Sequence, residues 1–110
     1  MTPLEAFQIV DMRVGTVVAA EPFPEARKPA FKLTIDFGPD LGRKRSSAQL
    51  TALYAPEALV GRQVVAAVNL GTRRIAGFAS EVLVLGAVPR EGEVILLAPE
   101  RPVANGARIA

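Results

Sequence analysis

The chain has 110 residues, half of them hydrophobic, which suffices for one domain with a single buried core. It contains no cysteine and no histidine, so disulfides, thiol chemistry and imidazole acid–base or metal chemistry are excluded. The net charge is only +2, but residues 27–74 carry nine basic against three acidic residues, whereas the rest carries four against eight. This asymmetry favours one positively charged face, with scattered solvated charges as the alternative.

The first ten residues predict a short helix that ends before Asp11. Thr2 is its expected N-cap, Pro3 suits the first helical position, and Glu5 completes a Thr-x-x-Glu capping box. Three hydrophobic side chains of this helix are expected to point inward: Leu4, Phe7 and Ile9.

No basic leader or long apolar stretch is visible at the start of the sequence. The longest apolar runs, near Val64–Val68 and Val82–Val88, are too short to span a bilayer. We therefore expect a cytoplasmic location.

Strand patterns follow the helix. Met12–Ala20 is rich in β-branched residues, with Gly15 as a bulge or tight bend, and the two prolines of residues 21–25 predict a loop. Residues 31–37 alternate between hydrophobic and polar side chains, which indicates a half-buried strand. Residues 38–42 form a turn, and Arg43–Leu50 is a third strand whose polar content implies exposure.

The second half contains short elements separated by turns. Thr51–Tyr54 is expected to form one helical turn, and Pro56–Gly61 a helical connector closed by glycine. Apolar strands are expected at 64–70, 82–88 and 94–97, with a late hairpin turn at Asn105-Gly106. Five or more short strands, with a small helix between the third and fourth, predict an all-β, five-stranded Greek-key barrel. Another small barrel of the SH3-like kind is the alternative.

Two segments carry a resemblance to a known family. They are Phe7-x-x-Val10-Asp11-Met12-Arg13-Val14-Gly15 and Val68-Asn69-Leu70-x-x-Arg73-Arg74-Ile75-x-Gly77-x-x-Ser80-Glu81-x-Leu83. Together they resemble the tRNA-binding OB domain, found in stand-alone tRNA-binding proteins and appended to some aminoacyl-tRNA synthetases. The resemblance covers essentially the whole of residues 1–110 and implies a single OB-fold domain.

Within that family the sequence is most similar to the CsaA group of small chaperones linked to protein export. The matching stretches are Phe23-Pro24-Glu25-Ala26-Arg27, Ile35-Asp36-Phe37-Gly38, Ser46-Ser47-Ala48-Gln49, Arg73-Arg74-Ile75-Ala76-Gly77-Phe78 and Ser80-Glu81-Val82-Leu83-Val84-Leu85-Gly86. The sequence departs from the tRNA-binding pattern after the third strand, where Ala48-Gln49-Leu50 stands in place of Ser-Gly-Ile. The loop at residues 70–72 also lacks a lysine, and both departures weaken the expectation of tRNA binding.

The resemblance implies a homodimer formed through an N-terminal arm and a C-terminal extension, which are residues 1–10 and 95–110 here. The expected interface residues are Leu4, Phe7, Ile9, Val103 and Ile109. The alternative is that these side chains only cap the bottom of the barrel.

Basic and polar residues of the central segment are the candidate ligand-binding residues, for a peptide or for tRNA. They are Lys32, Arg43, Lys44, Arg45, Ser47, Asn69, Arg73, Arg74, Phe78, Ser80 and Glu81. Arginine offers planar donors to phosphate or carboxylate groups, and Lys32 with residues 43–45 would form a positive rim on the usual OB binding face. The alternative is that these charged residues bind no ligand and form an ordinary solvated surface.

Several of these residues have a second interpretation. Asn69 would bind ligand or brace the following loop, and Ser80 would bind ligand or stabilise its turn. Glu81 would repel phosphate but accept from a basic or N–H donor, which favours a peptide. Phe23, Tyr54 and Phe78 remain for a surface, and Phe78, in a glycine-containing loop beside the arginines, could anchor a peptide side chain.

The sequence therefore predicts a binding protein and no enzyme, cofactor or metal site. The first hypothesis is an ATP-independent chaperone that holds unfolded or precursor polypeptides and contacts export machinery. A structured-RNA binder that contacts tRNA backbone is the second. A purely structural adaptor is the third.

Overall fold

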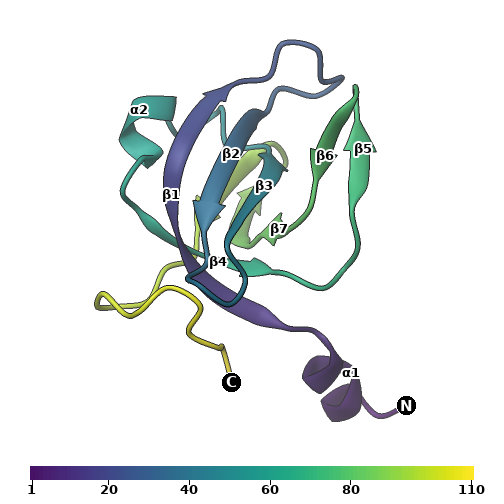
Figure 1. Cartoon of the computed structure of the whole chain (residues 1–110). Helices are drawn as coiled ribbons and strands as arrows, with labels where there is room; N and C mark the ends of the chain where they lie inside the picture. Colours follow the sequence, from purple (N-terminus) through teal and green to yellow (C-terminus); the bar gives the residue numbers. More distant parts are fainter.

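Five antiparallel strands form the main sheet of the computed structural model, which describes residues 1–110. In chain order they are β1 (Met12–Pro22), β2 (Phe31–Asp36), β3 (Arg43–Ala48), β4 (Gln63–Ala67) and β7 (Leu83–Val84), and the spatial order is β3-β2-β1-β4-β7. The sheet curls into a barrel (Figure 1), and the seam between β3 and β7 is joined by a hydrogen bond from Ser46 Oγ to the Val82 carbonyl at 2.8 Å. The predicted all-β OB-type barrel is confirmed.

The alternation along β2 produces the barrel core as predicted. Phe31, Leu33 and Ile35 are buried, while the polar residues between them are partly exposed. The third strand is less exposed than predicted, because Ser46 and Ala48 also face the core. Burying the Ser46 hydroxyl is tolerated because it donates the seam hydrogen bond just described.

Gly15 makes room for core side chains, and the predicted bulge there is wrong, because Gly15 pairs with Val64 in unbroken register. A Cβ atom at this position would lie 2.6 Å from Ile35 Cγ2 and 2.7 Å from Phe37 Cδ1. The irregularity in β1 falls instead between Val17 and Ala19, where the register with β2 shifts. The prediction of an irregularity was therefore correct for this strand but wrong in placing it at the glycine.

Strand β1 also runs further than predicted. Glu21 pairs with Lys32 and Pro22 with Phe31, so the first two residues of the predicted loop belong to the ladder. The pairing of β1 with β4 ends at Thr16, so no strand pairs with Pro22 on that side of β1. The N–H that proline lacks is therefore not needed there for a hydrogen bond between strands.

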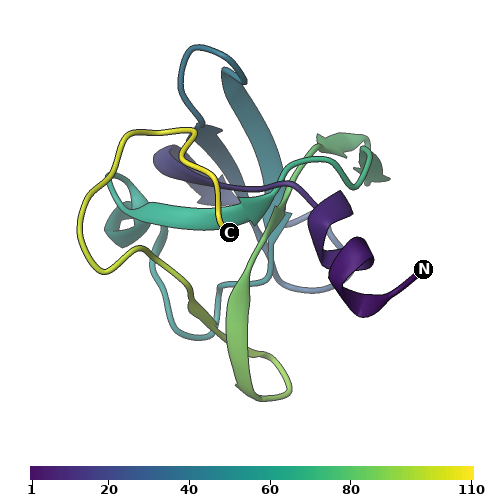
Figure 2. The ribbon, with the colours of Figure 1, turned by 90° about the horizontal axis from the view of Figure 1, so that it is seen from below.

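Two helices accompany the barrel. Helix α1 (Pro3–Ile9) begins with the predicted capping box, and α2 (Pro56–Leu59) fills the predicted connector, ending near Gly61 at a φ of +92°. Helix α1 projects away from the barrel (Figures 1 and 2) and buries none of its residues, so the expectation that its hydrophobic side chains point inward is wrong for the single chain. Neither helix has the length and hydrophobicity that crossing a membrane requires.

Two hairpins lie outside the main sheet. One joins β5 (Arg73–Ile75) to β6 (Phe78–Ser80), and the other joins β8 (Gly86–Arg90) to β9 (Glu93–Leu96). The predicted single strand at 82–88 is wrong, because it divides at Leu85, whose N–H donates to the Val65 carbonyl. The two pieces then pair with different partners, β7 with β4 and β8 with β9.

The C-terminal segment returns to β1 rather than forming the predicted hairpin. Asn105 and Gly106 do make a turn, with Gly106 at a φ of +94°, but the following residues pair with β1. The Val14 N–H donates to the Ala107 carbonyl and the Ile109 N–H to the Met12 carbonyl, both at 2.9 Å. Both termini therefore lie at the lower end of the barrel in Figure 1, opposite the β1–β2 loop.

Candidate ligand-binding hollow

The β5–β6 hairpin carries the two arginines that the sequence singled out. It closes through Ala76 and Gly77, whose φ angles of +47° and +81° suit a tight two-residue hairpin turn. The expected loop at this position is therefore wrong, and Arg73, Arg74 and Phe78 lie on paired strands. The turn was missed because an alanine occupies the position at which asparagine or glycine would have signalled it.

Phe78 fixes this hairpin to the barrel from below. It is 6 % exposed and packs against Phe23, which is 3 % exposed, with ring centroids 5.3 Å apart. The predicted surface position of both rings is wrong, because charged groups cover them: Lys32 Nζ lies 4.8 Å from the Phe23 centroid and the Arg45 guanidinium 4.3 Å from that of Phe78. The Phe78 ring thus makes cation–π contacts with Lys32 and Arg45, and it is too buried to anchor a peptide side chain.

Ser80 and Glu81 connect the end of the hairpin to β3. The Ser47 N–H donates to Ser80 Oγ at 3.0 Å, and the Arg45 N–H donates to Glu81 Oε1 at the same distance. The Glu81 N–H returns a bond to the Arg45 carbonyl at 2.8 Å. Ser80 therefore joins two strands rather than stabilising its own turn, and the N–H donor that Glu81 accepts from belongs to this chain.

A hollow of about 860 Å³ opens between this hairpin and the β1–β2 loop. Four cations line it, and we call this surface the basic hollow: Arg27, Lys28, Arg73 and Arg74. None of the four makes an ion pair within 4.0 Å, although Glu25 lies at the same rim. The remaining lining includes Ser47, Gln49 and small apolar side chains. Because none of these positive charges is ion-paired, and only Arg74 has a hydrogen bond within the chain, to the Gly77 carbonyl at 3.3 Å, the hollow suits an anionic or strongly hydrogen-bonding ligand.

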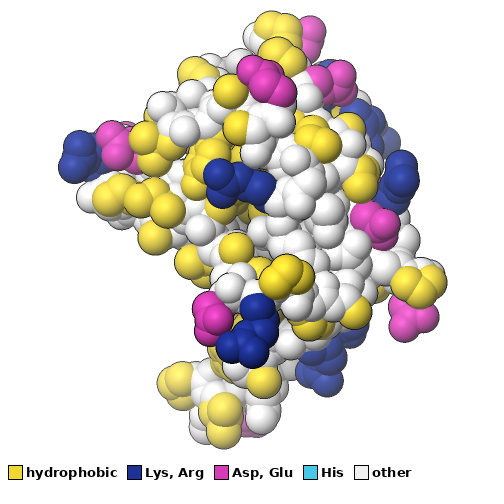
Figure 3. All heavy atoms as spheres, turned by 90° about the vertical axis from the view of Figure 1, so that its left-hand side faces the viewer, with side chains coloured by type: hydrophobic (Ala, Val, Ile, Leu, Met, Phe, Trp, Pro, Cys, Tyr) yellow, Lys and Arg dark blue, Asp and Glu magenta, His cyan; other side chains and the backbone are white.

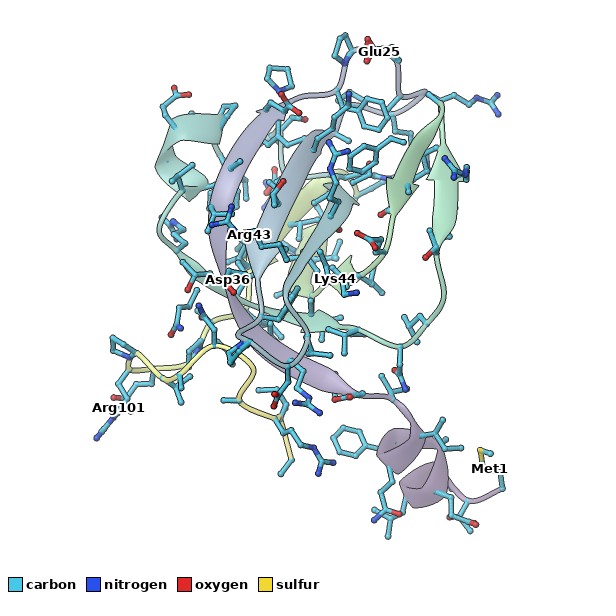
Figure 4. All side chains as sticks on the ribbon, viewed as in Figure 1. Met1, Glu25, Asp36, Arg43, Lys44 and Arg101 are labelled. Carbon is cyan, nitrogen blue, oxygen red and sulfur yellow. The ribbon has the colours of Figure 1, made fainter.

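The other predicted cations lie outside the basic hollow. Lys32 and Arg45 lie beside it over the two phenylalanine rings, and Arg45 also approaches Glu21 at 3.8 Å. Arg43 and Lys44 are at the other end of β3, far from Glu25 at the upper rim (Figure 4). The predicted rim is therefore divided into two groups, of which only Lys32 and Arg45 adjoin the hollow.

Asn69 braces the chain, but at a different place from the one predicted. Its Oδ1 accepts from the Asp11 N–H and its Nδ2 donates to the Ile9 carbonyl, both at 2.8 Å. The side chain therefore fixes the junction between α1 and β1 rather than the loop that follows it.

Arg13 connects the junction between α1 and β1 to the C-terminal segment. Its guanidinium donates to both oxygens of the Asp11 carboxylate, at 2.7 and 3.2 Å, and to the Gly106 carbonyl at 3.0 Å. These bonds with Asp11 raise the pKa of Arg13 above its ordinary value, so it stays charged.

Sequence reasoning missed four polar residues that line the basic hollow: Arg27, Lys28, Gln49 and Glu25. The first two belong to the basic segment whose charge imbalance was noted, and they follow the Phe-Pro-Glu-Ala stretch of the resemblance. The charge count was therefore the signal that could have found them. What it could not provide is that the β1–β2 loop folds opposite the β5–β6 hairpin.

Comparison with known proteins supports the fold and the family. The family model described as "Putative tRNA binding domain" matches residues 12–108. The chain belongs to this tRNA-binding-domain family. Methionine–tRNA ligase of Methanocaldococcus jannaschii is 34 % identical over 100 residues, which cover 91 % of this chain but 15 % of the ligase. The chain thus spans only a small part of the curated relatives that it matches.

Solved structures described as CsaA chaperones match the chain over its full length. The chaperone CsaA of Bacillus anthracis is 55 % identical, with a TM-score of 0.94, and the match covers 100 % of this chain and 99 % of that one. CsaA of Picrophilus torridus is 42 % identical, with a TM-score of 0.91 and full coverage of both chains. The predicted resemblance to the CsaA group is confirmed.

Proposed function

We propose that this chain is an ATP-independent chaperone of the cytoplasm that binds unfolded or precursor polypeptides during protein export and catalyses no reaction. The observation that carries the proposal is the basic hollow, with four cations free of internal ion pairs. The likeness to two structures described as CsaA chaperones supports it. Chaperone activity, export substrates and export partners are all part of this proposal.

The lining of the basic hollow suits an extended polypeptide. Guanidinium groups bind carboxylates and backbone carbonyls through several parallel N–H donors, and Arg73 and Arg74 supply two such groups on one strand. Ser47 and Gln49 add hydroxyl and amide groups that pair with a peptide backbone. The hollow would therefore hold segments by contacts with their backbone and with their acidic side chains.

We further propose that the protein works as a homodimer through α1 and the C-terminal segment. Leu4, Phe7 and Ile9 are 65 %, 47 % and 58 % exposed, and Val103 is 42 % exposed; Ile109, the fifth predicted interface residue, is partly exposed. Helix α1 is the lowest part of the molecule in Figure 3, and hydrophobic side chains are visible on its surface there. A seven-residue helix is marginal in water without a packing partner. This end lies opposite the basic hollow, so a dimer would leave the hollow open.

A tRNA ligand is the second candidate function. The family model and the unpaired cations of the basic hollow favour it, since phosphates would neutralise the same charges. The two ligands differ in salt dependence. The logarithm of the affinity for tRNA should fall linearly with the logarithm of the salt concentration, by roughly 0.7–0.9 per phosphate contact, whereas affinity for a polypeptide with few charges should fall much less.

The test compares two double variants that remove the same charge. Arg73→Ala with Arg74→Ala removes two of the four cations of the basic hollow, whereas Arg90→Ala with Arg101→Ala removes two arginines that lie outside it. We expect the first pair to weaken binding of an unfolded precursor polypeptide at physiological salt and the second to leave it unchanged. Equal affinities for both variants would refute the proposed site, and binding of total tRNA but no polypeptide would establish the second candidate instead.

The dimer is tested separately by light scattering. We expect Leu4→Ser with Phe7→Ser to produce monomers, because it removes exposed hydrophobic area from α1 without touching a buried side chain. Leu53→Ser, at a leucine that is 48 % exposed outside the proposed interface, is the control. A stable dimer in the double variant would exclude α1 as the main support.

A further inference from the structure

A second, smaller hollow of about 160 Å³ adjoins the basic hollow. We call it the apolar niche, and its hydrophobic lining consists of Leu70, Ile75, Val82 and Leu83. The two hollows share Ser47, Arg73 and Ile75 as lining residues, so they meet along strand β5.

The apolar niche has the size of one side chain. A cavity of about 150 Å³ lined by aliphatic side chains accommodates a single benzene ring, so a space of this volume suits one leucine, valine or phenylalanine side chain. Leu70 and Leu83 are 54 % and 51 % exposed in the free chain. An occupant would therefore remove apolar surface from water on both sides of the contact.

The chemistry of the niche favours a polypeptide over a nucleic acid. Single-stranded nucleic acids gain much of their affinity by stacking bases on aromatic side chains. The two rings nearest this region, Phe23 and Phe78, are buried under Lys32 and Arg45, and no aromatic side chain lines either hollow. An aliphatic niche beside unpaired cations complements an aliphatic side chain beside a carboxylate.

We propose that the two hollows form one composite site, which selects polypeptide segments with an apolar residue next to an acidic one. In an extended segment the side chains of neighbouring residues point to opposite sides of the backbone. A segment that crosses strand β5 therefore places its acidic side chain among Arg27, Lys28, Arg73 and Arg74 and its apolar side chain in the apolar niche. This inference rests on the proposed function and adds the class of segment that the site prefers.

The test uses labelled, unstructured glycine–serine peptides and fluorescence anisotropy with the full chain. One peptide carries Asp-Leu-Asp, a second replaces the leucine with glycine, and a third replaces both aspartates with asparagine. We expect the first to bind at least about tenfold more tightly than the glycine peptide, since burial of one leucine side chain contributes more than the 1.4 kcal/mol of a tenfold change. It should also bind more tightly than the asparagine peptide, because neutral amides form weaker hydrogen bonds with the cations of the basic hollow than carboxylates do.

A variant of the niche identifies where the leucine binds. Leu70→Ser should weaken the leucine peptide and leave the glycine peptide unchanged, whereas Leu53→Ser, at an equally exposed leucine outside both hollows, should change neither. Affinity for tRNA should be the same in Leu70→Ser and the unmodified chain, since the niche would contact no base. Thermal unfolding of both variants should match that of the unmodified chain.

The outcomes separate this inference from the proposed function. If the glycine peptide binds as tightly as the leucine peptide and Arg73→Ala weakens both, the niche is not a subsite while the basic hollow still binds polypeptide. If neither the acidic peptides nor an unfolded precursor polypeptide binds and only tRNA does, the proposed function fails and this inference fails with it. If Leu70→Ser weakens tRNA binding to the same extent as peptide binding, the preference for a polypeptide is wrong.

Discussion

Replacing Phe78 by alanine should loosen the hairpin that carries Arg73 and Arg74. Core substitutions of phenylalanine by alanine cost about 3–5 kcal/mol of unfolding free energy. Phe78 belongs to a cluster of only three buried residues, with Phe23 and Ala30, which can relax more readily than the main core. We therefore expect a loss near the lower end of that range, about 3 kcal/mol.

Urea unfolding measures this loss. With a urea dependence of about 1–3 kcal/mol per molar, typical of small domains, the midpoint should fall by about 1–3 M. Affinity for an unfolded polypeptide should fall in the same variant, because Phe78 supports β6 and, through it, the paired strand β5. The control is Leu53→Ala, at a leucine that is 48 % exposed outside both hollows and the proposed interface, which should leave polypeptide affinity unchanged. Wild-type stability and affinity in Phe78→Ala would refute the argument that this ring positions the hairpin.

Three further changes probe the framework. Gly15→Ala should lower the free energy of unfolding by about 1–3 kcal/mol, because its Cβ would overlap Phe37 in the core; unchanged thermal unfolding would contradict this. Asn69→Ala should leave the Asp11 N–H without its partner, so amide exchange at this residue should quicken while polypeptide affinity is kept; unaltered exchange would show that the side chain does not brace the junction. Hydrogen bonds from the backbone and side chain of Thr2 lower the pKa of Glu5, so the cap contributes stability at neutral pH and loses it as the pH falls through that pKa. An NMR titration should place the Glu5 midpoint below that of a free glutamate, and an ordinary midpoint would mean that the capping box is not formed in solution.

The sequence predicted the parts of the fold that depend on local pattern. Alternation along residues 31–37 fixed the core face of β2, and the Thr-x-x-Glu motif placed α1. The prediction failed where the local structure depends on contacts between segments that are distant in the sequence. Gly15 was predicted to form a bulge because its close neighbours, the Ile35 and Phe37 side chains, come from a distant part of the sequence. Asn105-Gly106 looked like a hairpin because the pairing of the C-terminal segment with β1 is not encoded nearby.

The candidate site was predictable to a similar extent. Arg73 and Arg74 were identified from the resemblance and the charge imbalance, and both line the basic hollow. Phe78 was assigned to a surface as part of a glycine-containing loop beside the arginines, whereas its ring packs on Phe23, a residue 55 positions earlier in the sequence. A contact of that sequence separation has no local signature, and the same holds for the meeting of the β1–β2 loop with the β5–β6 hairpin.

The most direct test of the account is to locate a bound polypeptide on the full chain by NMR chemical-shift mapping. With an unfolded precursor polypeptide at physiological salt, the account predicts that the amides of Arg27, Lys28, Arg73 and Arg74 shift together while that of Arg101 stays in place. Shifts confined to another face, with these four amides unmoved at saturation, would contradict it.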